Sequence, residues 1–209
     1  MMKHFDKASI LEAESFYRRD LINSLSGYKS LNLIGTKSKE GLTNLAPFSQ
    51  VFHIGATPPL VGVLFRPHSV ERHTLENILD TAAFTLNHVT EGFYRQAHQT
   101  AARYEGSEFE ATGIGEEYHL DFFAPFVKGS PLQIGCKLEE TQVIKANGTV
   151  LVVGAIEHIW VDEKGVRMDG SLDLNALGTV TVTGLDEYHL GQKIGRLSYP
   201  KPGRDLVEI

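Results

Sequence analysis

From Tyr28 onward, short runs of apolar and β-branched residues alternate with turn signals, which is typical of a protein built mainly of β-strands. Asn147-Gly148 separates two of these runs, and this dipeptide is a strong signal for a β-hairpin. Because strands dominate and antiparallel hairpins recur, the pattern favours a β-barrel with peripheral helices over a βαβ sheet. The predicted strands span residues 31–36, 45–54, 60–65, 84–89, 133–144, 150–161 and 179–183.

Three stretches have the apolar spacing of helices instead. Residues 9–24 carry an apolar stripe that ends near Gly27, and this helix is expected to cover one edge or the mouth of the barrel. A central helix begins with Thr74 as its predicted N-cap, and its expected apolar face consists of Leu75, Ile78, Leu79 and Ala82. The third predicted helix spans residues 92–104.

Three consecutive segments indicate a site for a planar ligand that carries a phosphate. Residues 43–49 predict a strand with a proline-interrupted turn, which leaves backbone N–H and C=O groups free to face a planar ring. Residues 58–67 predict an apolar strand that ends in a cation, Arg66. Residues 72–77 place two basic residues and a hydroxyl at a helix start, where unpaired N–H groups and the helix dipole accept a phosphate. Such a helix start binds many anions, so it does not by itself identify the ligand.

The order, spacing and residue types of these segments resemble those of the flavin reductase-like family. This family comprises the FMN-binding split barrels and includes bacterial flavin reductases and flavoredoxin-type proteins. Further segments that resemble this family are residues 28–38, 84–89, 124–131 and 151–158. The resemblance covers residues 15–200. It implies one domain over residues 1–209, a Greek-key antiparallel barrel, bound FMN, NADH or NADPH as co-substrate, and a homodimer.

The resemblance also implies which residues bind FMN. An asparagine side chain can both donate to and accept from the flavin's pyrimidine ring, so Asn44 is placed against that edge. Arginine suits phosphate because its planar fork makes paired charge-assisted bonds. The family often has an acidic residue where this chain has His73. The predicted cofactor-binding residues are Asn44, Leu45, Ala46, Ser49, Phe65, Arg66, Arg72, His73 and Thr74.

Because hydride chemistry belongs to the flavin, no side chain is required as a nucleophile. The two histidines that we place as candidates near the ring are His98 and His158. Residues 92–104 and the loop at residues 122–131 are the candidates for a lid over the ring.

Composition narrows the function classes. A formal net charge of −6 without a basic run argues against nucleic-acid binding. The nine histidines have no metal-site spacing, and the single cysteine, Cys136, is expected to be buried. The start of the chain does not have the pattern of a secretion signal, and no apolar run approaches the length of a membrane span, so a cytoplasmic protein is expected.

Three functions stay open at this point. The first is an NAD(P)H-dependent FMN reductase. The second is a flavoredoxin-type carrier that exchanges electrons with a redox protein partner and lacks nicotinamide turnover. The third is a non-enzymatic module that binds a flavin or another anion. The chain has no Gly-rich dinucleotide fingerprint, so the choice between NADH and NADPH also stays open.

Overall fold

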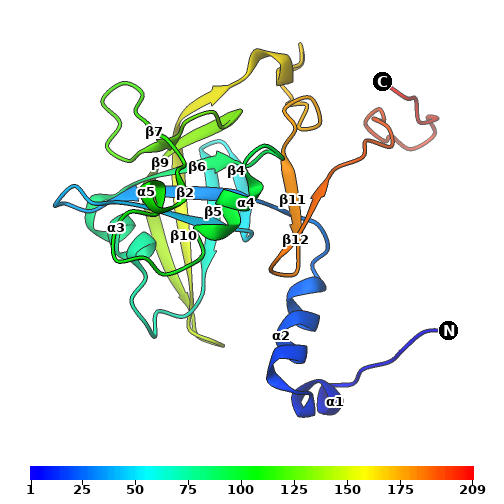
Figure 1. Ribbon diagram of the computed structural model, residues 1–209. Helices are drawn as coiled ribbons and strands as arrows, with labels where there is room; N and C mark the ends of the chain where they lie inside the picture. Colours follow the sequence, from blue (N-terminus) through cyan, green and yellow to red (C-terminus); the bar gives the residue numbers. More distant parts are fainter.

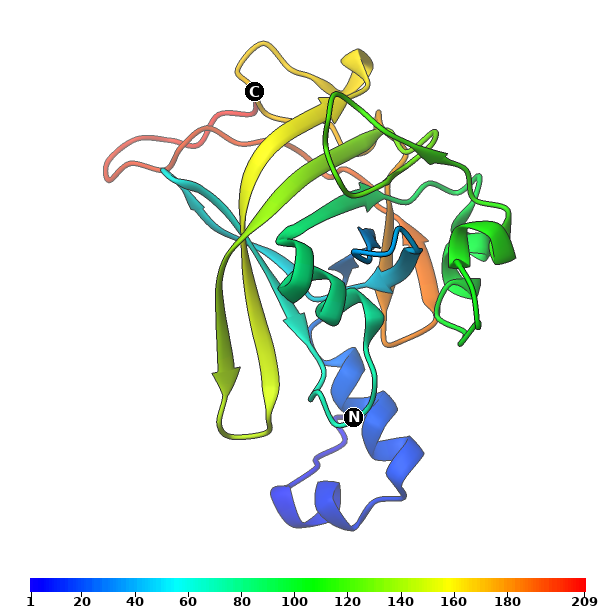
Figure 2. The ribbon, with the colours of Figure 1, turned by 90° about the vertical axis from the view of Figure 1, so that its left-hand side faces the viewer.

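The computed structural model describes residues 1–209, and its main element is a curled antiparallel sheet of seven strands (Figures 1 and 2). The strand order is β3-β2-β6-β9-β10-β5-β4, so that strands adjacent in the sheet are often distant in sequence. This order confirms the predicted mainly β barrel with peripheral helices. The strands are β2 Asn32–Lys37, β3 Thr43–Phe48, β4 Val51–Ala56, β5 Pro59–Phe65, β6 Ala83–His88, β9 Leu132–Ile144 and β10 Thr149–Val161.

The longest hairpin, β9 and β10, projects beyond the barrel wall (Figure 2). Its turn contains Asn147 and Gly148, as predicted, with Gly148 at φ 76° and the Asn147 side chain accepting from the Thr149 N–H. Two bulges, one at Glu139 in β9 and one at Glu157 in β10, bend the hairpin, since each bulge adds local twist.

The predicted strand over residues 45–54 is wrong in one respect: the chain turns at Ser49 and Gln50 and forms β3 and β4 instead. These two strands are the opposite edges of the main sheet. Within this turn, the Gln50 carbonyl accepts a hydrogen bond from the Leu64 N–H of β5. The turn is thus bonded to the sheet at the point where the chain passes from one edge strand to the other. The turn therefore brings both free edges to one side of the barrel.

The barrel wall separates two apolar cores, and β2 contributes to both because successive strand residues face opposite sides. Leu33 lies in the first core, between the barrel and the short helices, while Ile34 lies in the second, inside the barrel. The second core also contains Cys136, which is fully buried as expected. Burial raises the pKa of its thiol far above the usual value, which keeps the sulfur unreactive.

The remaining elements surround this barrel (Figure 1). A sheet with the order β1-β11-β12 packs beside it, and a two-stranded ribbon, β7 and β8, crosses one end. The small strands are β1 Lys29–Ser30, β7 Glu116–Glu117, β8 Phe126–Val127, β11 Val180–Thr183 and β12 Glu187–Leu190. The helices are α1 Lys7–Glu12, α2 Ser15–Ser24, α3 His73–Thr81, α4 Tyr94–Gln99, α5 Glu108–Thr112 and the 3-10 turn η1 Glu163–Gly165. The longest of them, α2, has ten residues, and no helix has both the length and the apolar character that crossing a membrane requires.

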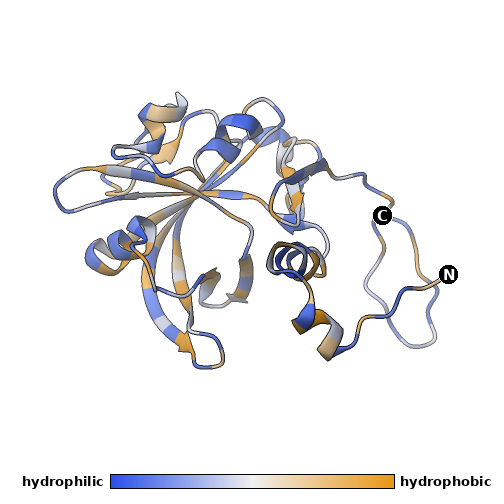
Figure 3. Ribbon diagram, turned by 60° about the horizontal axis from the view of Figure 1, so that its bottom comes forward, coloured by the Kyte–Doolittle hydropathy of each residue, from blue (hydrophilic) through white to orange (hydrophobic).

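The N-terminal prediction is wrong, because residues 9–24 form parts of two helices that extend away from the barrel (Figures 1 and 3). The break has a local cause: the Glu14 side chain accepts the N–H groups of Phe16 and Tyr17, so that a new helix begins there. No residue of α1 or α2 is buried. In α3, likewise, Leu75 and Ile78 are buried, whereas Leu79 is 48% exposed and Ala82 is the left-handed C-cap.

Candidate functional site

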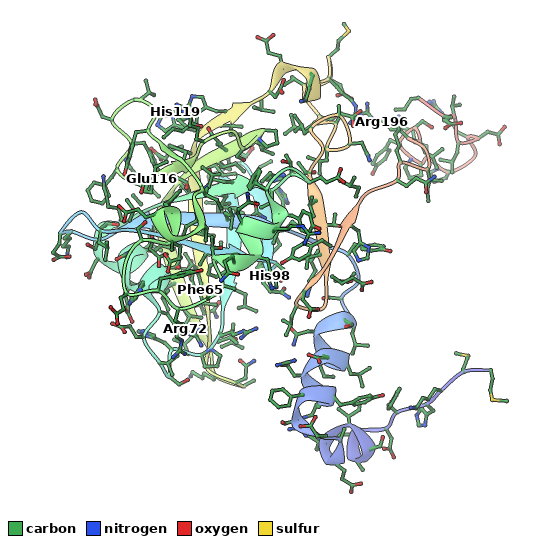
Figure 4. The ribbon with its side chains drawn as sticks, viewed as in Figure 1. Phe65, Arg72, His98, Glu116, His119 and Arg196 are labelled. Atoms are coloured by element: carbon green, nitrogen blue, oxygen red, sulfur yellow. The ribbon has the colours of Figure 1, made fainter.

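A cavity of about 520 Å³ opens where the free edge of β3 meets the end of β5, the start of α3 and the segment between α4 and α5. Its volume is within the range of small-molecule and cofactor sites. Figure 4 shows Phe65 and Arg72 on this side of the barrel. Seven of the nine predicted cofactor-binding residues line the cavity, namely Ala46, Ser49, Phe65, Arg66, Arg72, His73 and Thr74.

The start of α3 differs from the prediction, because Arg72 is the N-cap and Thr74 is already within the helix. Glu76 explains the difference: its carboxylate accepts the Arg72 N–H at 3.0 Å, so that the cap needs no hydroxyl. The same bond, supported by His68, lowers the pKa of the Glu76 carboxyl. The Thr74 hydroxyl is therefore available for another partner.

That partner is Asn44, which lies behind the cavity wall. Its amide nitrogen donates to the hydroxyls of Thr74 at 2.9 Å and Thr36 at 3.3 Å, and Asn77 donates to the same Thr36 hydroxyl at 3.1 Å. All four side chains are buried. Because the Thr74 oxygen accepts from Asn44, its own hydrogen is left to donate into the cavity. Asn44 itself does not line the cavity.

Cations outnumber acids around the cavity. Arg66, Arg72 and Arg103 line it, together with only two acidic residues, Glu71 and Glu108. None of the three arginines forms an ion pair. Arg72 is oriented by one bond, from its Nε to the Pro67 carbonyl at 3.0 Å, and its terminal nitrogens remain free for a ligand. In a chain with net charge −6, this local excess of positive charge at a helix start suits the binding of an anion.

The edge of β3 forms a second part of the wall. One side of β3 pairs with β2, and the other side has no partner strand. Pro47 suits this edge because it lacks an N–H. Leu45 is buried in the first core, and its N–H is already bonded to the Glu108 carboxylate at 3.0 Å. Leu45 does not line the cavity, and its N–H is not free as the sequence predicted.

Aromatic side chains supply the apolar surface. The rings of Phe48 and Phe65 meet with centroids 4.8 Å apart, and both line the cavity. Phe65 is almost fully buried and belongs to the barrel core, while Phe48 packs against that core from the cavity side. A planar ligand would find a firm apolar wall here, since both rings are fixed by the core.

The two candidate histidines lie elsewhere. His98 is on α4 and its Nδ1 forms a hydrogen bond with the Tyr188 hydroxyl at 2.6 Å (Figure 4). His158 contacts Phe122 and Trp160 in an aromatic cluster on β10. Neither lines the cavity, so the structure does not bring them to the predicted site.

The two predicted lids have different outcomes. The end of the 92–104 segment does line the cavity, although α4 itself ends at Gln99. The loop at residues 122–131 does not line it, and residues 124–127 are buried. The Thr85 hydroxyl donates to the Pro125 carbonyl at 2.6 Å, and Gly35 lies so close to that carbonyl that a Cβ there would stand 2.3 Å from the oxygen. This loop is therefore pinned to β2 and β6 and is not a lid for the cavity within this chain.

Sequence reasoning missed Glu108 and Arg103. Both come from the chain around α5, which carries no motif that distinguishes it from other short helices. The position of α5 depends on tertiary contacts, since the Thr43 hydroxyl bonds both Ser107 at 2.8 Å and Glu116 at 2.6 Å.

Comparisons with known proteins agree with this fold. A family model described as "Flavin reductase like domain" matches residues 28–172. A split-barrel protein of Shewanella frigidimarina NCIMB 400, provisionally described as a flavin reductase, is 50% identical, with a TM-score of 0.92 over 95% of this chain and 100% of that chain.

Two more distant structures share the fold alone. The 2-nitrobenzoate 2-nitroreductase of Pseudomonas fluorescens is 22% identical, with a TM-score of 0.82 over 97% of this chain and 99% of that chain. Flavoredoxin of Desulfovibrio vulgaris (Miyazaki F) is 22% identical, with a TM-score of 0.70 over 97% and 98% of the two chains. Together with the Shewanella structure, they confirm the split barrel.

Proposed function

Because the chain belongs to the flavin reductase-like family, we propose that it binds FMN in the cavity beside α3 and acts as an NAD(P)H-dependent FMN reductase. One observation carries this proposal. A cavity of suitable volume has two different parts. At one part, the start of α3 and arginines without ion pairs suit a phosphate; at the other, an unpaired strand edge and an aromatic wall suit a planar ring. The flavoproteins among the structural neighbours support the same cofactor.

The residues present fit the phosphate of FMN. Arg66 and Arg72 would hold it by charge-assisted bonds, and the first N–H groups of α3 would add donors at the positive end of the helix dipole. The Thr74 hydroxyl would donate its hydrogen to the phosphate. Asn44 orients this hydroxyl, because its amide nitrogen donates a hydrogen bond to the Thr74 oxygen. His73 would contribute little, because it is half exposed and lies 3.5 Å from the Glu71 carboxylate.

The residues also fit the ring and its side chain. Ala46 and Pro47 present a small, flat stretch of edge strand, Phe48 and Phe65 form the apolar wall, and Ser49 lies where a hydroxyl can bond the ribityl chain. When bound, FMN supplies the redox chemistry. The protein's own part is to position the ring, exclude water from one face and hold the phosphate.

Flavoredoxin-type electron transfer is the second candidate, and the match in fold to the Desulfovibrio protein favours it. In that case the same cavity would hold FMN, and the partner would be a redox protein instead of a nicotinamide. A non-enzymatic module would use the arginines at the start of α3 for FMN or another anion and would show no turnover.

Optical spectra distinguish these functions. We expect the purified protein to show a flavin spectrum, and we expect stopped-flow mixing with NADH or NADPH to bleach it at a rate that saturates with nicotinamide concentration while FMN stays bound. Dithionite is the control that reduces any bound flavin. If dithionite bleaches the spectrum and neither nicotinamide does so within minutes, the reductase proposal fails and the electron carrier replaces it. A protein that binds no FMN contradicts both.

We also propose that the protein is a homodimer. The motivation is the exposed apolar surface of the N-terminal region, where large side chains are 47% to 71% exposed; these are Phe16, Tyr17, Ile22, Leu25 and Tyr28. Isolated apolar residues are common on surfaces, but several large ones on and just after a projecting helix suit an interaction site. Light scattering at micromolar concentration should give the mass of two chains, and a monomer that still binds FMN would contradict this proposal.

A further inference from the structure

Glu108 is a buried carboxylate with only one of its two oxygens occupied. Its side chain is 7% exposed and lines the cavity, and its Oε2 accepts the Leu45 N–H at 3.0 Å. Its Oε1 has no hydrogen-bond partner in the chain. No side-chain polar atom of the chain is both buried and unpartnered, so Oε1 keeps some exposed surface, and Glu108 lines the cavity. One oxygen is thus anchored to β3, and the other is presented to a ligand.

The surroundings of Glu108 restrict what this oxygen can bind. The carboxylate forms no ion pair with Arg66, Arg72 or Arg103, although all four residues line the same cavity. A phosphate would be repelled by it and would bind beside the arginines instead. A buried carboxylate accepts hydrogen bonds and cannot donate them when ionised, so the ligand must present a hydrogen-bond donor to it.

We propose that Glu108 accepts a hydrogen bond from the imide N–H, N3–H, of the flavin's pyrimidine ring and so determines the orientation and the redox potential of the cofactor. This inference rests on the proposed function. The imide is the one N–H group of the oxidised ring, and it belongs to the uncharged end of FMN, away from the phosphate. The negative charge of Glu108 also opposes extra electron density on that ring, so the carboxylate lowers the reduction potential.

Glu108→Gln tests this role without loss of the anchor. The glutamine carbonyl oxygen can still accept the Leu45 N–H, which turns the amide N–H₂ toward the cavity. A donor then faces the donor of the imide. The matched control is Glu110→Gln, which removes a charge from an exposed position of the same helix, outside the cavity. Thermal unfolding of each variant shows whether α5 stays in place.

The decisive measurement is the ratio of dissociation constants for FMN and for 3-methyl-FMN, in which a methyl group replaces the imide hydrogen. Loss of a hydrogen bond to a charged group corresponds to at least about tenfold in affinity. The wild-type protein should therefore prefer FMN at least about tenfold, Glu110→Gln should keep that preference, and Glu108→Gln should bring the ratio near one. The midpoint potential of bound FMN should rise in Glu108→Gln and stay unchanged in the control.

Two outcomes overturn the inference while FMN binding stands. The first is that the wild-type protein binds FMN and 3-methyl-FMN equally; this result can be interpreted without any variant. The second is Glu108→Gln weakening both flavins by the same factor with an unchanged potential, which would mean that the carboxylate only joins α5 to β3. If the wild-type protein binds no FMN at all, the proposed function fails together with this inference.

Discussion

Replacing Arg72 with alanine and Thr74 with valine in one variant should weaken FMN binding at least tenfold and leave riboflavin binding nearly unchanged. Both side chains line the cavity at the start of α3, and riboflavin lacks the phosphate that we place there. Each hydrogen bond to a charged phosphate contributes about 1.5–3 kcal/mol, and about 1.4 kcal/mol corresponds to a tenfold change in affinity. Titration of flavin fluorescence measures both dissociation constants.

The comparison of two ligands separates phosphate binding from damage to the fold. Thr74→Val also removes the acceptor for Asn44, so the melting temperature of the variant should be measured alongside. Arg204→Ala, at an exposed position of the C-terminal tail, is the control for the loss of one positive charge. Equal losses for FMN and riboflavin would place the phosphate elsewhere in the cavity.

Protonation of His88 should make the fold less stable in acid. Burial lowers the pKa of this β6 side chain from 6.5 to about 4, because the charged imidazolium is poorly solvated there. Below pH 6.5 the unfolded chain binds this proton while the folded chain does not, so the free energy of unfolding falls as the pH falls. The loss should level off below about pH 4 and reach up to about 3 kcal/mol, since each pKa unit corresponds to about 1.4 kcal/mol.

Denaturant unfolding of His88→Gln between pH 7 and pH 4 checks this expectation. The variant should lose much less stability than the wild-type protein over that interval. His4→Gln, in the exposed N-terminal segment, is the control and should keep the wild-type profile. Carboxyl groups with lowered pKa, such as Glu76, add their own acid dependence at lower pH, but they are common to all three proteins. Parallel profiles for His88→Gln and the wild type would show that His88 does not control this loss.

Local sequence patterns were sufficient for several features that depend on neighbouring residues, but not for the helix break at Glu14 or the N-cap of α3. The Asn147-Gly148 signal located the hairpin correctly, because its four-residue connection needs a positive φ, which Gly148 adopts readily. The candidate anion-binding segment was also visible, because Arg72, His73 and Thr74 are consecutive at the start of a helix, and all three line the cavity. The resemblance to the flavin reductase-like family predicted seven residues that line the cavity, because these residues lie in short contiguous segments.

Tertiary structure decided the contacts between residues that are distant in sequence. The bond from Leu45 to Glu108 joins positions 63 residues apart, and the bond from Asn44 to Thr74 joins positions 30 apart. No local pattern shows that α5 docks on the edge of β3, or that Asn44 turns away from the cavity to hold a hydroxyl in place. The loop at residues 122–131 was likewise predicted as a lid because its composition is that of a loop, whereas its packing depends on Gly35 and Thr85 in other strands. Sequence alone thus located most strands of the main sheet and the contiguous segment at residues 72–74, while contacts between distant segments decided which backbone groups and which carboxylate line the cavity.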